Sequence, residues 1–122
     1  MVFSRWVFRL AGIYGLIVLL PQFLLENRIG AENPPAITHP EYFYGFIGVG
    51  VAWQVAFLVI AYDPARLRPM MLPSVLEKVS FGAAAIVLFS LDRLQGMILA
   101  AGVIDLMWAA LFLVAWRRLA AK

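Results

Sequence analysis

The sequence predicts an all-α fold: an integral membrane bundle of four transmembrane helices, with the N-terminus and the C-terminus in the cytoplasm. Hydrophobic residues make up 64% of the 122 residues and charged residues only 14%, and the mean hydropathy is +0.89. A soluble domain of this size has too much surface for its volume to hide that much apolar material. Four apolar segments also reach the length of about 20 residues that a helix needs to cross the hydrocarbon layer. We therefore expect a single transmembrane domain over residues 1–122.

The four helices are expected at about 8–25, 42–62, 73–91 and 96–116, with an outer loop at 26–41. The first segment follows two arginines and could instead be a secretory signal, although the residues after it offer a poor cleavage site. The outer loop, ENRIGAENPPAITHPE, contains three prolines and has no regular period. We expect it to form an ordered or semi-ordered cap without a helix of its own.

Prolines set several of these helix boundaries. Pro40 precedes the second helix and Pro64 follows it, because proline cannot continue a helix from its interior. Pro73 fits the first turn of the third helix, where the missing N–H has no intrahelical partner to lose. Pro21 is expected to kink the first helix or to end its regular part.

The basic residues fix the orientation that we expect. Lys and Arg gather in cytoplasmic loops of membrane proteins, and here they concentrate on the side that carries both chain ends. This asymmetry favours the inner membrane of a bacterium, with both termini and the loop at 63–72 in the cytoplasm. Residues on the cytoplasmic side are Arg5, Arg9, Arg66, Arg68, Arg117, Arg118 and Lys122, and those on the outer side are Arg28 and Arg93.

Several classes of site are not predicted. The chain has no cysteine, which excludes disulfides and thiolate ligands, and its basic residues sit at span ends and not on a nucleic-acid-binding face. The outer mouth gathers His39 and Glu41 with Glu26 and Glu32, but without the spacing of a metal site, so we interpret it as a solvated loop. No phosphate-binding glycine loop or serine elbow is present. We assign no catalytic residue, metal or cofactor.

Asp105 lies near the middle of the fourth helix, in LAAGVIDLMWAALF. A charge at that depth costs ~2.5–3.5 kcal/mol even on lenient insertion scales, so its side chain should face the bundle and be protonated or paired. Ala101 and Ala109, one turn away on either side, would let another helix approach closely. Two interpretations stay open: a proton or ligand site, or a protonated Asp that hydrogen-bonds across to another helix.

Glu77 and Lys78 lie one turn into the third helix, and adjacent residues on a helix cannot share a face. We expect Lys78 to snorkel to the headgroups. Glu77 shares its face with Ser80 and Ala84, which suggests that it points inward. The alternative is an interfacial Glu77 held by Arg66 or Arg68.

Gln54 lies among apolar residues in the middle of the second helix. Gly48, Ala52 and Ala56 form a small-residue packing stripe on another side of that helix, so Gln54 would point to a different neighbour or into a central cavity. The alternative role is an interhelical hydrogen bond worth ~0.6–2 kcal/mol. Tyr14 in the first helix is a similar, weaker candidate.

Two segments resemble the EXPERA-type membrane proteins, the family of the emopamil-binding protein and its sigma-type receptor relatives. IYGLIVLLPQFLLE is similar to that family's pattern of an early Tyr and a closing acid, here Tyr14 and Glu26. PEYFYGFIGVGVAWQVAFLVIA is similar to its pattern of a Pro, an aromatic pair and a buried Gln, here Gln54. The resemblance implies a four-helix bundle with a hydrophobic ligand cavity. The family usually has a glutamate at the position of Gly50, so isomerase activity is not expected.

The leading functional hypothesis is a small membrane protein that binds a lipid, a quinone or an isoprenoid-like molecule in an intramembrane cavity. Such a cavity should lie beside Asp105 or Gln54. The alternative is a non-catalytic accessory subunit of a larger membrane complex, or a homodimer, in which case Gly48 and Ala52 should face outward. A proton-coupled small exporter is a third class, but such exporters carry an acid within the first helix, where this chain has none.

Overall fold

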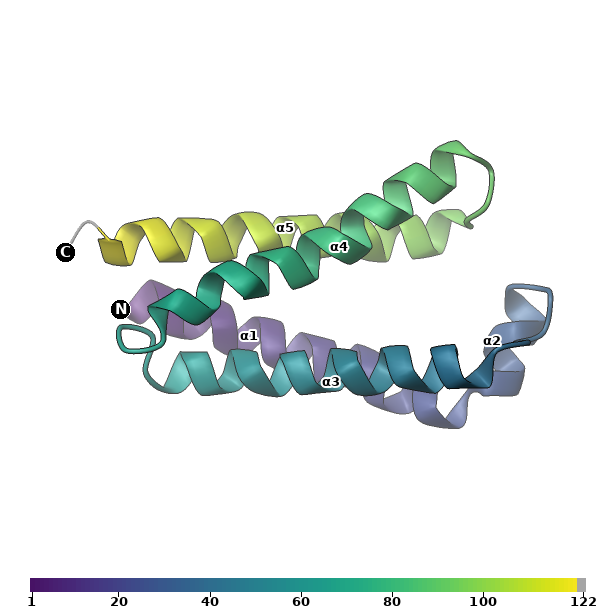
Figure 1. The fold of residues 1–122 in the computed structure, drawn as a ribbon, viewed down its shortest axis with the longest axis horizontal. Coiled ribbons are helices and arrows are strands. Elements are labelled where there is room, and N and C mark those ends of the chain that lie inside the picture. The colour runs from purple at the N-terminus through teal and green to yellow at the C-terminus, as the bar shows by residue number, and fades with distance from the viewer. Residues whose placement is uncertain (121–122) are drawn as a thin grey trace.

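The computed structural model describes residues 1–120, and within them every regular element is helical (Figure 1). Four segments are long and apolar enough to cross a membrane: Val2–Leu24, Pro40–Tyr62, Arg68–Ser90 and Gly96–Ala120. The predicted all-α fold, with four helices long and apolar enough to span a membrane, is thus confirmed. The α-helices are α1 (Val2–Leu19), α2 (Glu26–Glu32), α3 (Pro40–Tyr62), α4 (Met71–Ser90) and α5 (Gly96–Ala120), and the 3-10 segments are η1 (Leu20–Leu24) and η2 (Arg68–Met70).

The helices begin and end a few residues from the expected positions. The first span begins at Val2 and not near residue 8, and the last extends to Ala120 and not to residue 116. Both extensions run into arginine-containing sequence, which a helix tolerates once it leaves the hydrocarbon layer. Pro21 lies in η1, so the α-helical part of the first span ends just before the proline, as expected.

The loop at 26–41 contains a helix that was not predicted. Residues Glu26–Glu32 form α2, in which Arg28 Nε donates to Glu32 Oε1 at 2.9 Å across one turn. The following residues fold back over this helix. Their backbone passes so close to Gly30 that an added Cβ would lie 3.1 Å from Cα of Ala36. The helix is therefore supported by contacts with its own return segment, which periodicity within seven residues cannot reveal.

The bundle consists of two helical hairpins. In the first hairpin α1 lies along α3, and in the second α4 lies along α5. Figure 1 shows the hairpins close together at the end that carries the N-terminus and diverging toward the other end. We call the first the closed end and the second the open end.

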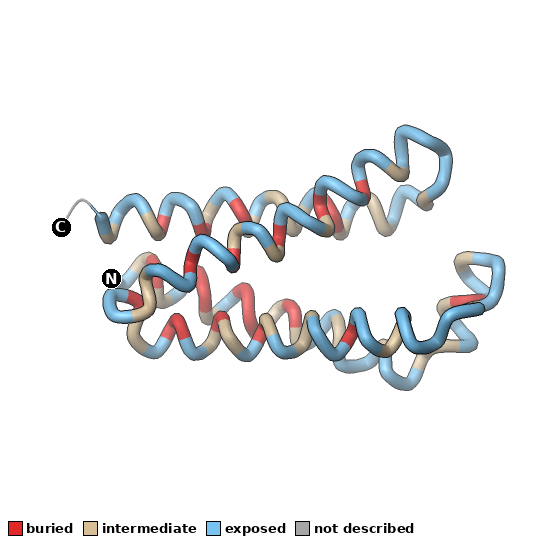
Figure 2. Tube along the Cα trace, viewed as in Figure 1, coloured by how far each residue is buried: buried red, intermediate tan, exposed pale blue. Residues whose placement is uncertain are grey.

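The hydrophobic core lies near the closed end, where Figure 2 shows most of the buried positions. Three fully buried rings form its centre: Phe8 stacks on Phe112 with centroids 4.1 Å apart, and Phe57 meets Phe112 edge-on at 5.0 Å. Each comes from a different helix, so this aromatic core joins the two hairpins. Smaller buried residues complete it: Val7, Ala11, Ile60, Ala61, Met71 and Ala115.

Small residues bring α4 and α5 close together. A Cβ added at Gly82 would lie 2.9 Å from the carbonyl oxygen of Gly102, and one added at Gly102 would lie 2.5 Å from Cβ of Ala85. Ala109 is buried and Ala101 is partly buried on the same helix. Close backbone approach of this kind is a main source of helix association in lipid, where apolar side chains gain nothing from leaving the solvent.

The small-residue stripe on α3 behaves differently. Gly48 and Ala52 are exposed, Ala56 is only partly buried, and a Cβ at Gly48 would meet no atom within 4 Å. The stripe thus does not pack against another helix of this chain. The first hairpin instead uses Gly12 and Gly15 of α1, whose Cβ atoms would collide with atoms of Gln54 in α3.

These contacts predict opposite effects for two glycine-to-alanine changes. Gly82→Ala should lower the free energy of unfolding by about 1–3 kcal/mol, because the added methyl group has no room against α5. Gly48→Ala should be neutral or stabilise by up to about 1 kcal/mol, since alanine favours the helix and the position is open. Thermal unfolding of both variants in the same detergent measures the difference. Equal midpoints would contradict the packing described for α4 and α5.

Candidate functional site

Four polar side chains lie together at membrane depth, next to the aromatic core. We call Gln54, Glu77, Lys78 and Asp105 the polar layer. Gln54 lies eight residues before the end of α3 and Lys78 seven residues after the start of α4. At 1.5 Å per residue, both are roughly 10–12 Å inside the bundle from the closed end. The polar layer therefore belongs to both hairpins and lies well inside the spans.

Lys78 is at the centre of this layer and does not snorkel to the headgroups, so that prediction was wrong. Its side chain is only 3% exposed, and its Nζ lies 3.6 Å from Oδ1 of Asp105 and 3.8 Å from Oε1 of Glu77. The ammonium also lies 5.2 Å from the ring centroid of Phe57. Both distances from Nζ to a carboxylate oxygen are longer than the length of a direct hydrogen bond, so these contacts are ion pairs without a hydrogen bond. Asp105 thus faces the bundle and is paired with a charged group of another helix, while its role as a proton or ligand site stays a prediction.

The inward face of α4 explains the position of Lys78. The buried residues of α4 are Met71, Ser74, Lys78, Gly82 and Ala85, which recur at helical spacing. Ser80 and Ala84 had been expected to mark the inward face, but both are exposed. Lys78 is therefore on the stripe that faces the bundle, and Glu77 is on its edge.

Glu77 is partly buried and reaches across to the first hairpin. Gln54 Nε2 donates to its Oε1 at 3.4 Å, and Lys78 is its ion-pair partner. The arginines considered as alternative partners are engaged elsewhere or exposed: Arg68 Nε donates to the Trp116 carbonyl oxygen, and Arg66 is exposed. Glu77 is thus paired with Lys78 and Gln54 and not with Arg66 or Arg68.

Gln54 is 1% exposed and links three helices. Its Nε2 also donates to the carbonyl oxygen of Gly50 at 2.9 Å, one turn earlier in α3. Its Oε1 accepts no hydrogen bond and lies against Gly15 of α1, where a Cβ would overlap it. An unpaired buried acceptor is uncommon in folded proteins and requires an explanation.

Tyr14 and Trp108 lie beside the polar layer, where α1 meets α5. Their ring centroids are 6.1 Å apart. Trp108 Nε1 is buried and has no acceptor, so the region contains an unpaired donor as well as an unpaired acceptor. Trp108 was not among the site residues predicted from the sequence. Its position three residues after Asp105, on a similar side of α5, is the signal that could have identified it.

The charges of the polar layer are unbalanced when all of its groups are ionised. One ammonium faces two carboxylates, and water is scarce at this depth. A proton on one carboxyl group would balance the layer, or a polar group from outside could complete it. Within residues 1–120, no three His, Cys, Asp or Glu side chains are grouped so as to hold a metal ion.

The other candidate residues lie away from the polar layer. Glu26 belongs to α2 at the open end and accepts a hydrogen bond from the Tyr44 hydroxyl at 2.9 Å. His39 Nδ1 lies 3.7 Å from Oε1 of Glu41, and both side chains are about two-thirds exposed (64% and 67%). These residues form the rim of the open end and do not join the polar layer.

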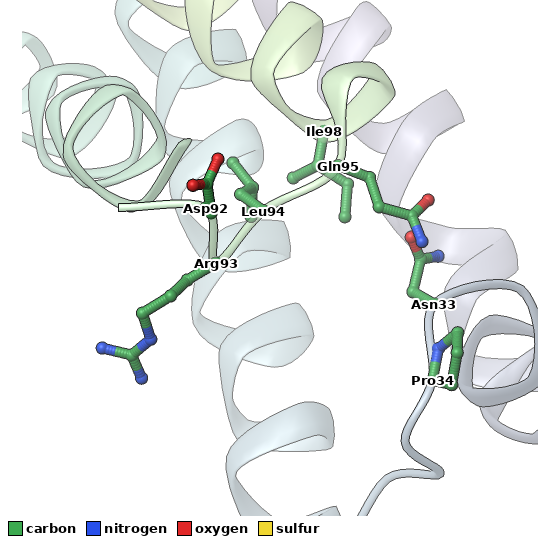
Figure 3. A pocket seen from close by; sticks show the side chains of 7 residues that line it. All are labelled: Asn33, Pro34, Asp92, Arg93, Leu94, Gln95 and Ile98. Atoms are coloured by element: carbon green, nitrogen blue, oxygen red, sulfur yellow. The ribbon is translucent and has the colours of Figure 1, made fainter. Parts of the chain in front are cut away.

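The two most distinct surface hollows do not touch the polar layer, so neither of them is the cavity expected beside Asp105 or Gln54. A hollow of about 390 Å³ lies at the open end, between the end of α2 and the turn from α4 to α5 (Figure 3). Gln95 Nε2 donates to the Glu32 carbonyl oxygen at 3.2 Å and bridges these two segments. A second hollow, of about 220 Å³, lies beside Ala52 and Trp53. The residues lining the first are Asn33, Pro34, Asp92, Arg93, Leu94, Gln95 and Ile98.

No protein-family model, curated protein or solved structure matches this chain. The EXPERA-type resemblance therefore stays a prediction. The site is interpreted from its own geometry.

The ion pairs predict a strong coupling between Lys78 and Asp105. Lys78→Met leaves two buried carboxyl groups without their cation and should lower the free energy of unfolding by about 3–5 kcal/mol. Asp105→Asn should cost less, since Lys78 keeps Glu77. In the double variant the loss should be smaller than the sum of the two single losses. Unfolding in detergent of all four members of the cycle measures this coupling, with Ser80→Ala as an exposed control. Strict additivity would contradict the pairing.

Proposed function

We propose that this protein binds a hydrophobic molecule with a polar end, such as a lipid, a quinone or an isoprenoid, inside the membrane. The polar end would lie at the polar layer and the apolar body between the two hairpins, toward the open end. The observation that carries the proposal is a charged layer at membrane depth that includes an unpaired acceptor on Gln54 and lies beside an unpaired donor on Trp108. Helix packing alone does not require three ionisable groups there, and each is expensive to bury.

The arrangement of the hairpins supports entry from the open end. The aromatic core closes the bundle on one side of the polar layer, while the hairpins diverge on the other (Figure 1). Neither surface hollow reaches the polar layer, so binding requires the hairpins to separate further at the open end. The outer halves of α1 and α5 present apolar side chains such as Ile17 and Val103, which suit an apolar ligand body.

The proposal includes the inner membrane of a bacterium as the location, with both termini in the cytoplasm. The concentration of arginines at the closed end supports this orientation. The open end would then face outward, and the ligand would enter from the outer leaflet. No reaction is proposed, because Gly50 stands where the resemblance would require an acid.

Bound hydrophobic molecules in the purified protein test this function. Protein extracted from membranes in a mild detergent should carry a hydrophobic molecule that native mass spectrometry and solvent extraction identify. Trp108→Phe removes the indole N–H donor together with the five-membered ring that carries it. Gln54→Leu removes the side-chain amide and keeps a side chain of similar size. Each should reduce occupancy at least ~tenfold, a loss of about 1.4 kcal/mol of binding free energy. Ser80→Ala, on the exposed face of α4, should retain it. Equal occupancy in all four proteins, or none in the wild type, would refute the proposal.

We propose as a second candidate an accessory subunit that packs against a partner through α3. The specific observation is that Gly48 and Ala52 face outward and leave the helix backbone accessible to another helix. The hollow beside Ala52 and Trp53 lies along the same helix.

A bulky side chain on this stripe tests the second candidate. Gly48→Leu should abolish migration as a larger complex in native gels of mildly solubilised membranes, because it keeps the partner helix away. Val49→Leu, a change at a neighbouring exposed apolar position, should leave the complex intact. Migration of the wild type as a monomer alone would contradict this role, and cross-linked masses would separate a homodimer from a larger assembly.

A further inference from the structure

The closed end carries a strong excess of positive charge. Segments 1–9, 61–72 and 116–120 meet there and contain six arginines but a single acid, Asp63. The Asp63 carboxylate accepts a hydrogen bond from the Arg66 backbone N–H at 3.3 Å, so it is not directed at a guanidinium group in a side-chain ion pair. The surface is therefore basic whichever way the chain is oriented.

Two of these arginines are held in place by aromatic rings around the last turns of α5. The Arg68 guanidinium carbon lies 4.3 Å from the centroid of the Trp116 ring, and its Nε donates to the Trp116 carbonyl oxygen at 2.9 Å. The Arg118 guanidinium carbon lies 4.5 Å from the centroid of the Phe3 ring, which belongs to α1. Stacking of this kind fixes a guanidinium plane, so less side-chain entropy is lost when it binds a ligand.

The Arg68 contact also removes a charge that would oppose anion binding. The last carbonyl groups of a helix carry partial negative charge. Arg68 Nε donates to one of these carbonyl oxygens, which leaves its two terminal nitrogens for other acceptors. Within residues 1–120 the Arg118 guanidinium lies over the Phe3 ring and has no carboxylate or carbonyl partner. Both forks are thus available to an oxyanion.

The surroundings favour an amphiphile over a free ion. Each guanidinium lies on an aromatic ring at the end of a membrane-spanning helix, the level at which phospholipid headgroups meet acyl chains. The planar fork of arginine matches two oxygens of a phosphate group, which the point charge of lysine does not. A phosphate joined to apolar chains could contact the guanidinium and the adjoining apolar helix surface together.

We propose that Arg68 and Arg118 form two headgroup sites for anionic phospholipids at the closed end of the bundle, on either side of the last turn of α5. Each guanidinium binds phosphate oxygens while its supporting ring lies against the lipid glycerol and upper acyl chains. The sites are separate from the polar layer and do not depend on the function proposed for it.

Binding of defined lipids to the purified protein tests the inference. In native mass spectrometry, phosphatidylglycerol should bind the wild type at least ~tenfold more tightly than phosphatidylcholine, and phosphatidylglycerol vesicles should raise its unfolding temperature. Arg68→Lys with Arg118→Lys keeps the charge and removes the forks, and should weaken phosphatidylglycerol binding about fivefold or more. The matched control, Arg66→Lys with Arg117→Lys, changes two exposed arginines that stack on no ring and should bind as the wild type does.

Several results would overturn the proposal. If the Arg68/Arg118 variant binds phosphatidylglycerol as tightly as the wild type, only non-specific charge attraction remains as an explanation. The same holds if both double variants lose the same amount of phosphatidylglycerol affinity. Inorganic phosphate that protects the protein as well as the lipid does would identify an ion site and not a lipid site. If the Arg68/Arg118 variant does not fold, Arg118→Lys alone gives the same test, since that side chain is exposed.

Discussion

At membrane depth, an ionised side chain must find its partners within the protein, because the hydrocarbon offers it none. Lys78 meets this constraint by lying between carboxylates of its own helix and of α5, with Gln54 of α3 bonded to one of them. The arrangement requires α4 to turn a single face inward and to approach α5 closely, which Gly82 and Gly102 allow. The ion pairs and the glycine contacts thus support each other, and both determine how the second hairpin lies against the first.

The same constraint relates the two ends of the bundle. Phe8, Phe57 and Phe112 hold the hairpins together on one side of the polar layer, and no comparable cluster of buried rings joins them on the other side within the described residues. The polar layer lies where tight packing gives way to divergence. A ligand that separates the hairpins at the open end would act against the Gln95–Glu32 hydrogen bond and the Phe46–Phe81 ring pair, and not against the fully buried rings of the aromatic core. The proposed route of ligand entry rests on this asymmetry.

Two other surfaces of the bundle are those proposed to contact membrane lipid and a partner helix. The arginine–ring pairs at the closed end are built from three segments of sequence that no local pattern connects, and they give that surface a fixed geometry as well as a charge. The outward stripe on α3 is chemically different, since it offers exposed backbone and no charge. Binding of lipid at the first surface and of a helix at the second could occur in one molecule without competition.

The sequence by itself determined the four spans, because the need to satisfy each backbone group within its own helix is local and is met by length and composition. It also predicted that Pro21 would kink the first helix or end its regular part, and the second alternative is found. Tertiary structure decided the rest of the site. Whether Lys78 snorkels or is buried depends on Asp105, which lies on another helix, and both outcomes are compatible with α4 alone. Whether Gln54 could be buried depended on glycines of α1, and whether the stripe at Gly48 packs depended on which face of α3 those glycines occupied. The short helix α2 lies against its own return segment at Gly30, a contact within one loop. The other outcomes follow from contacts between residues distant in the chain, which no helical period encodes.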